Sequence, residues 1–177
     1  MEVPANAEQF SVNTPEFNNQ RDKLIFQAEK PVYSKTDGKV VGEHQGAHYF
    51  TIGQRKGLNV GGTKEPLFVI DTDVDKNIIY TGQGKSHPGL YRNTLFIKED
   101  ELHWVRPDLA LKLDETMEVK ARIRYRQPLQ QATLYKVENG LFVDFKDKQS
   151  AITEGQFAAW YLDDELIGSG VISWSEA

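Results

Sequence analysis

The stretch ATLYKVENGLFVDFK, residues 132–146, decides the fold. Two runs of alternating apolar and polar residues flank the pair Asn139-Gly140, which readily adopts the positive φ angles that a two-residue β-turn requires. The stretch therefore predicts a β-hairpin with strands at 132–137 and 141–146. Further runs with a period of two lie at 119–126, 156–162 and 165–174. Regularly spaced short strands predict a small closed or nearly closed β-barrel in this half of the chain.

The preceding residues predict a second, small β domain. Its β-prone runs, broken by glycines, lie at 39–43, 48–52, 67–71, 77–81 and 94–98. The periodicity disappears around residues 102–111, which indicates a domain boundary. Residues 1–22 are rich in Asn, Gln, Glu and Pro and show no apolar period. We therefore expect an all-β protein with little helix, divided into a flexible leader or insertion at 1–30, a central β domain at 31–105 and a C-terminal β-barrel domain at 106–177.

Composition narrows the possible functions. The 177-residue chain has no cysteine, which removes disulfides, thiolate nucleophiles and persulfide carriers. No apolar run approaches the roughly 20 residues that a membrane-spanning helix needs, so we expect a cytoplasmic protein without a membrane partner. The net charge of −5 argues against a general nucleic-acid binder. Residues 117–136, however, carry five Lys or Arg against one Glu, whereas residues 137–177 have a net charge of −6, and this asymmetry suits a partner that docks at one place.

No group of residues has the pattern of a catalytic or metal site. His44 and His48 have the spacing of two ligands on one helix face, but nearby glycines disfavour a helix there. The acidic residues at 71–75 lack the glycine and the glutamate of a calcium loop. The segment 82–86 lacks the spacing of a phosphate-binding loop, and no serine lies in a nucleophile elbow. We therefore predict no catalytic residue, no metal site and no cofactor in this chain.

One basic segment follows the alternation of a predicted strand. Lys120, Arg122, Arg124 and Arg126 are spaced two residues apart, so they would share one face of the strand at 119–126. Such a row spans roughly 20 Å, which is comparable to several phosphate spacings. The row is either a binding face for a polyanion or an ordinary solvated face.

A second basic segment lies in a loop flanked by glycines. Gln54, Arg55 and Lys56 follow Gly53 and precede Gly57. Glycine lets the backbone approach a ligand closely, and Arg can grip a phosphate or a carboxylate. The loop is either an anion-binding loop or a solvated turn.

Both basic segments belong to a longer pattern. The sequence GEHQG at 42–46, followed by YFTIGQRKGL at 49–58, resembles the signature of the central domain of bacterial tRNA-specific 2-thiouridylases, the MnmA or TrmU family. The resemblance continues through GGTK at 61–64, FVID at 68–71, Asn77, LHW at 102–104, RYRQ at 124–127 and GQ at 155–156. It covers residues 31–173 in the order of the family.

The resemblance implies an enzyme of three parts: an ATP-pyrophosphatase-type catalytic domain, a central β domain, and a C-terminal β-barrel similar to the second domain of elongation factor Tu. The family thiolates C2 of the wobble uridine of Lys, Glu and Gln tRNAs, using ATP, Mg and a cysteine persulfide. This chain has neither the nucleotide loop nor the catalytic cysteines. The resemblance therefore implies a tRNA-docking C-terminal fragment that is inactive alone. Its partners would be tRNA, the missing catalytic domain and a sulfur-relay donor protein.

The resemblance also names site residues. Position by position, it implies tRNA contacts at Arg124, Tyr125 and Gln156, and the basic row adds Arg122, Arg126 and Lys120. Strict alternation would put Tyr125 and Arg124 on opposite faces, so we expect either a twist or bulge there, or a contact through the tyrosine backbone.

The loop at 54–56 either contacts RNA or packs against the catalytic domain. Residues 3–22 have no clear counterpart in the commoner family members and resemble a lineage-specific insertion.

The alternative function is a self-standing β-barrel protein-interaction module whose basic face meets an acidic protein. A small-ligand β-barrel enzyme is a third, weaker alternative. Steeply salt-dependent tRNA binding would distinguish RNA docking from the interaction module.

Overall fold

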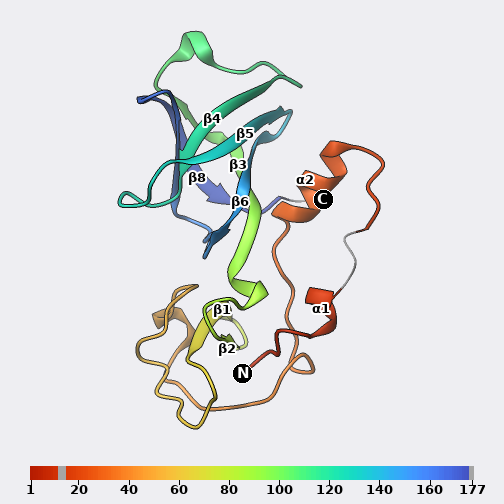
Figure 1. Ribbon diagram of the computed structural model, residues 1–177, viewed down its shortest axis with the longest axis vertical. Helices are drawn as coiled ribbons and strands as arrows, with labels where there is room; N and C mark the ends of the chain where they lie inside the picture. The colour runs from red at the N-terminus through yellow and green to blue at the C-terminus, as the bar shows by residue number, and fades with distance from the viewer. Residues whose placement is uncertain (12–14, 176–177) are drawn as a thin grey trace. The chain divides into compact units, whose positions relative to one another are not determined.

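The computed structural model describes residues 1–11 and 15–175, and these divide into two compact units (Figure 1). The small unit comprises residues 1–16 and 31–91, and the barrel unit comprises residues 17–30 and 92–177. Residues 12–14 of the predicted leader and 176–177 of the predicted barrel domain lie outside the described residues. No helix of the described residues is long and apolar enough to cross a membrane.

The barrel unit is built on a closed barrel with the strand order β3-β6-β5-β4-β7-β8. The strands are β3 (Tyr91–Trp104), β4 (Thr116–Arg122), β5 (Gln130–Val137), β6 (Gly140–Ser150), β7 (Phe157–Leu162) and β8 (Glu165–Ser173). The predicted hairpin at 132–146 is confirmed as the antiparallel pair β5–β6, in which Val137 lies opposite Gly140. Because β3 belongs to the barrel, the division between the two units falls at residues 91 and 92 instead of near residue 105.

Inward-facing apolar side chains fill the barrel, and Trp160 on β7 lies at their centre with no exposed surface. Its indole packs edge-on against Trp104, with ring centroids 5.6 Å apart. The neighbouring strand β8 offers Gly168 at this point, where a Cβ atom would lie 2.4 Å from the indole nitrogen. A residue without a side chain is therefore required beside the tryptophan.

The small unit contains a two-stranded antiparallel sheet, β1 (Leu67–Asp73) and β2 (Ile78–Gln83), surrounded by loops and short helices. The short helices are α1 (Glu8–Ser11) and the 3-10 helices η1 (Ala47–Tyr49) and η2 (Pro88–Leu90); a further one, η3 (Pro107–Leu109), lies in the barrel unit. The strands predicted at 39–43 and 48–52 were wrong. Only Lys39 forms a bridge, to Glu2, and the second segment contains η1. The backbone amide of Ala47, the first residue of η1, donates to the side chain of Asn77 at 2.8 Å and not to a neighbouring strand.

The predicted leader contributes to both units, and part of it is helical. Val3 is fully buried in the small unit, whereas α2 (Gln20–Ala28) belongs to the barrel unit. The Asn19 side chain accepts from the Asp22 amide at 2.9 Å and caps the helix. One face of α2 packs on the barrel through a cluster of buried residues: Leu24, Ala28, Phe96, Val137 and Phe142. This helix was not expected from the sequence.

Candidate nucleic-acid interface

The strand that carries the basic row ends earlier than its alternation predicts. Strand β4 ends at Arg122, and residues 123–127 form a turn. The turn is closed by two hydrogen bonds, from the Ile123 amide to the Gln127 side chain at 3.1 Å and from the Gln127 amide to the Arg124 carbonyl at 3.1 Å. The prediction of four cations on one strand face was therefore wrong. Arg124 and Tyr125 are both exposed on the turn, so the conflict between them disappears.

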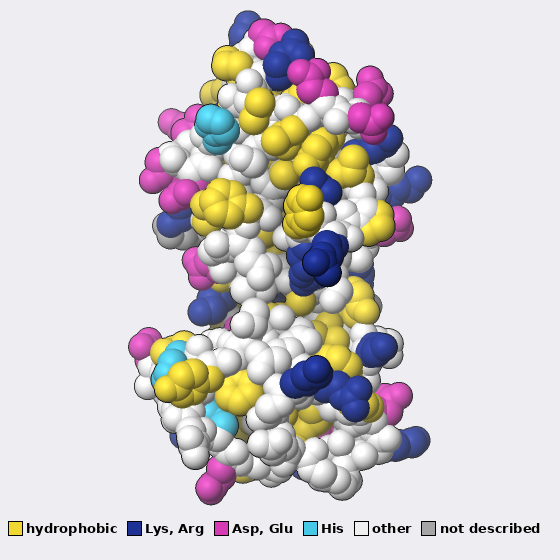
Figure 2. Space-filling view, turned by 90° about the vertical axis from the view of Figure 1, so that its left-hand side faces the viewer, with side chains coloured by type: hydrophobic (Ala, Val, Ile, Leu, Met, Phe, Trp, Pro, Cys, Tyr) yellow, Lys and Arg dark blue, Asp and Glu magenta, His cyan; other side chains and the backbone are white. Residues whose placement is uncertain are grey.

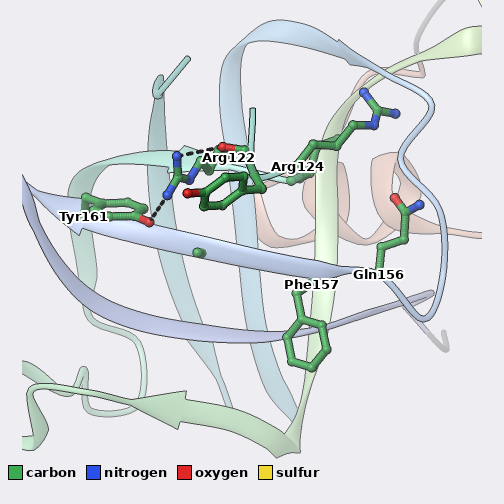
Figure 3. Close-up of a pocket in the computed structure, with 8 residues that line it drawn as sticks. Arg122, Arg124, Gln156, Phe157 and Tyr161 are labelled. Carbon is green, nitrogen blue, oxygen red and sulfur yellow. Dashed lines mark hydrogen bonds between the residues drawn. The ribbon is translucent and has the colours of Figure 1, made fainter. Parts of the chain in front are cut away.

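Arg122 fixes this turn to strand β7 (Figure 3). Its Nη1 donates to the backbone oxygen of Tyr125 at 2.9 Å, and its Nη2 donates to the hydroxyl of Tyr161 at 2.7 Å. The guanidinium carbon also lies 5.5 Å and 5.1 Å from the ring centroids of Tyr125 and Tyr161, which is cation–π geometry. Arg122 therefore acts as a clamp inside the site.

Arg124 is anchored differently, through one of its three nitrogens. Its Nη2 donates to the carbonyl oxygens of Ser150 and Ala151, both at 2.9 Å. Among the described residues no carboxylate forms an ion pair with it, and Nε and Nη1 have no hydrogen-bond partner there. A guanidinium has five N–H donors, so this side chain can hold a phosphate while it remains anchored to the barrel.

The turn, the end of β4, and β7 with the residue before it line an open hollow of about 500 Å³. Figure 3 shows Arg124 and Gln156 extending at one end of it and Tyr161 at the other. The residues that line the hollow are Arg122, Ile123, Arg124, Tyr125, Gln156, Phe157, Ala159 and Tyr161. Four of the six predicted tRNA contacts thus line one hollow. Figure 2 shows basic and hydrophobic side chains next to one another on a face of the barrel unit.

Two predicted residues do not line the hollow, and four that do were not predicted, two of them aromatic. Lys120 is half-buried on β4, opposite Gln131 and Tyr161, and Arg126 is exposed on the turn outside the lining. Phe157 and Tyr161 were not predicted to contribute. The outward alternation of β7 could have indicated them, since their neighbours Ala158 and Trp160 face the core.

In the small unit, the loop that contains Gln54 is held to strand β1. The Gln54 side chain accepts from the Thr51 amide at 3.1 Å and donates to the Lys56 carbonyl at 2.8 Å. The Gly53 amide donates to the Val69 carbonyl at 2.7 Å, and the Val69 amide donates to the Gln54 carbonyl at 2.9 Å. Arg55 and Lys56 are exposed, and neither forms an ion pair within the described part of the chain. Gln54 is therefore structural, and the two cations are free to meet a partner.

The segment at residues 82–86 does not have the structure of a phosphate-binding loop. The Gly84-Lys85-Ser86 segment forms the turn after β2 and leads into η2, where a phosphate-binding loop would lead into a long helix. Within residues 1–11 and 15–175, no three His, Asp or Glu side chains gather as ligands for a metal ion.

Comparison with known proteins adds two family models and several curated relatives. The models are described as tRNA methyl transferase PRC-barrel domain, over residues 22–83, and Aminomethyltransferase beta-barrel domain, over residues 94–172. The tRNA-specific 2-thiouridylase MnmA of Christiangramia forsetii is 62% identical over 173 residues, which are 98% of this chain and 44% of the relative. The MnmA of Flavobacterium johnsoniae is 59% identical over 93% of this chain and 44% of the relative, and that of Pseudomonas fluorescens is 41% identical over 88% and 41%.

The chain thus spans about 44% of the length of the first two of these relatives. The second family model covers β4, the turn and β7, so the residues of the hollow lie within the matched region. Matches that extend over nearly the whole chain at such identities show that the chain belongs to the tRNA-specific 2-thiouridylase family.

Proposed function

We propose that this chain is the tRNA-docking C-terminal part of a tRNA 2-thiouridylase. The full-length enzyme would thiolate C2 of the wobble uridine in the cytoplasm, using ATP and a cysteine persulfide. The observation that supports docking most directly is the hollow, which brings Arg124, Tyr125 and Gln156 together. In the sequence, strands β5 and β6 separate Gln156 from the other two residues.

The geometry of Arg124 suits a backbone phosphate. Two carbonyl oxygens hold its Nη2 in place, so little side-chain freedom remains to be lost on binding. The remaining N–H groups, on Nε and Nη1, point in different directions, and each can donate to a phosphate oxygen. Such contacts orient an RNA without reading its bases.

The chemistry would reside in the rest of the enzyme. The chain contains no cysteine, so it cannot carry a persulfide. ATP, Mg and the sulfur-relay donor protein would bind the missing catalytic domain. We expect the purified chain to leave tRNA unmodified when supplied with ATP, Mg and sulfide. Formation of 2-thiouridine, detected by retardation in a mercury-containing gel, would place catalysis in this chain and overturn the proposal.

The test of docking is a titration of tRNA with the purified chain at several salt concentrations. Arg124→Ala should weaken binding by about 1–2 kcal/mol, the scale of a charge-assisted hydrogen bond. The logarithmic salt slope should fall by about one unit, because one phosphate contact is lost. Arg21→Ala, an exposed arginine on α2, is the matched control for the loss of one positive charge.

Two results would contradict docking through Arg124. Equal affinities and slopes for both variants would remove Arg124 from the interface. Absence of salt-dependent tRNA binding by the unmodified chain would favour the alternative, an interaction module for an acidic protein.

A further inference from the structure

We infer that the hollow between the turn and β7 holds an unstacked nucleobase, next to the phosphate gripped by Arg124. This inference rests on the proposed function and makes it more specific. The bound element would be a single-stranded or unpaired nucleotide of the RNA, and not the backbone of a duplex alone.

Exposed aromatic rings are the first reason. Tyr125 and Phe157 both line the hollow and are 85% and 65% exposed. A phosphate gains nothing from such apolar faces, whereas an unpaired base stacks on them. Paired bases of an A-form duplex are already stacked and cannot reach these rings.

The tyrosine is held in place before any ligand arrives. Arg122 binds the Tyr125 backbone with one nitrogen and the Tyr161 hydroxyl with another, while its guanidinium faces both rings. This clamp ties the tip of the turn to β7. A surface that is ordered in advance loses less freedom when a base binds.

The shape of β7 leaves room for the base. Phe157, Ala159 and Tyr161 occupy successive outward positions on this strand, and the middle one is small. Figure 3 shows Phe157 and Tyr161 well separated along β7, with Gln156 next to Phe157. Ala159 is therefore the floor of the hollow, and a larger side chain there would fill it.

Gln156 supplies a hydrogen-bonding group at the edge of the hollow. Its amide oxygen is shielded from solvent and has no hydrogen-bond donor among the described residues. An unsatisfied shielded acceptor is uncommon in a folded protein. A turn of the Gln156 side chain towards the hollow would present this oxygen to an imino or exocyclic N–H of a base, a donor that an ionised phosphate lacks.

The experiment uses the whole chain and two RNA probes of equal length, one single-stranded and one a blunt duplex, each carrying the fluorescent base 2-aminopurine. The single strand should bind more tightly than the duplex, and its fluorescence should be quenched on binding because the base stacks. Ala159→Met should abolish the quenching and weaken single-strand binding about ten-fold, the scale of one lost base–aromatic stack. Ala159→Ser, which keeps the hollow open, should behave like the unmodified chain.

The outcomes separate this inference from the proposed function. If the duplex binds as tightly as the single strand, or if both Ala159 variants keep the quenching, the nucleobase site is wrong. In that case an effect of Arg124→Ala on tRNA affinity would leave docking intact. If neither RNA nor tRNA binds, docking and the nucleobase site fail together. Circular dichroism and melting temperatures of the two Ala159 variants establish that each retains the fold.

Discussion

The loop at residues 51–58 of the small unit and the turn at residues 123–127 of the barrel unit, which follows Arg122 at the end of β4, both expose basic residues. They are held in different ways. In the loop, the neutral amide of Gln54 makes the internal hydrogen bonds, so Arg55 and Lys56 stay unpaired among the described residues. At the turn, Arg122 makes those bonds itself, and Arg124 uses one of its nitrogens. The number of basic residues in a segment therefore does not give the charge that it offers to a partner.

The largest effect on stability is expected at the loop. Gln54→Ala removes two hydrogen bonds, each with a net contribution of about 0.5–1.5 kcal/mol, so the small unit should lose about 1–3 kcal/mol of its free energy of unfolding. Hydrogen exchange at the Val69 amide, which bonds to the Gln54 carbonyl, should accelerate. Gln45→Ala, an exposed glutamine of the same unit, is the control. Equal losses of unfolding free energy for both variants would mean that the Gln54 side chain does not stabilise the loop.

A smaller effect is expected when the clamp of the turn is changed without changing its charge. Arg122→Lys cannot reach the Tyr125 carbonyl and the Tyr161 hydroxyl together, because an ammonium lacks the planar fork. We expect a loss of about 0.5–1.5 kcal/mol in urea unfolding of the barrel unit. Arg126→Lys on the same turn should be neutral. A neutral Arg122→Lys would show that a positive charge alone suffices at the turn.

The two units should also respond differently to acid. In the small unit, His87 is buried, its Nδ1 accepts from the Gly89 amide at 3.2 Å, and its Nε2 lies 3.0 Å from the Val3 carbonyl. Burial lowers the pKa of His87, and the Val3 carbonyl and the Glu2 carboxylate only partly oppose this. The unfolded chain therefore protonates His87 more readily than the folded protein does. The contribution of His87 to stability is complete above about pH 6.5 and falls as the pH drops below it.

In the barrel unit, a half-buried carboxyl group acts in the opposite direction. Burial raises the pKa of Asp144, which the Thr94 hydroxyl partly counters with a hydrogen bond at 2.9 Å. The folded state binds this proton more readily than the unfolded chain, so the contribution of Asp144 rises as the pH falls towards about 4. Hydrogen exchange resolved by unit, at pH 7 and pH 5, should show protection lost mainly in the small unit. Equal losses in both units would contradict this difference.

The smallest effect on stability is expected at Gln156, the counterpart of Gln54 in the barrel. Its amide oxygen has no donor among the described residues, so Gln156→Ala removes no hydrogen bond made by that atom. The free energy of unfolding should change by less than about 0.5 kcal/mol, while RNA affinity falls. A loss of stability as large as that of Gln54→Ala would show that both glutamines support the fold.

Much of the barrel could be predicted from the alternation of its strands, because one face of each strand is buried. The Asn139-Gly140 pair placed the hairpin correctly between β5 and β6. The end of β4 could not be predicted, since apolar and basic residues continue to alternate after Arg122 and the turn is closed by hydrogen bonds of Gln127 that the alternation does not reveal. Helix α2 was missed because a short helix is stabilised mainly by tertiary packing, here against Phe96 and Phe142.

The candidate site depended less on periodicity. Arg124, Tyr125 and Gln156 were singled out by family resemblance, and the structure shows that they line one hollow. Periodicity alone gave Arg122, Arg126 and Lys120, and of these only Arg122 lines the hollow. Phe157 and Tyr161 were overlooked because outward aromatic residues on a strand are common, and only the neighbouring turn makes them part of a site.

The path of the chain between the two units limits how the protein can be divided. Residues 17–30 belong to the barrel unit although residues 1–16 and 31–91 belong to the small unit. No single cut therefore releases an intact barrel: a truncation that begins at Arg92 would remove α2 and leave Phe96, Val137 and Phe142 without their cover. The two units differ in architecture but are not independent modules, so genetic exchange of one unit would have to carry two separate segments of the gene.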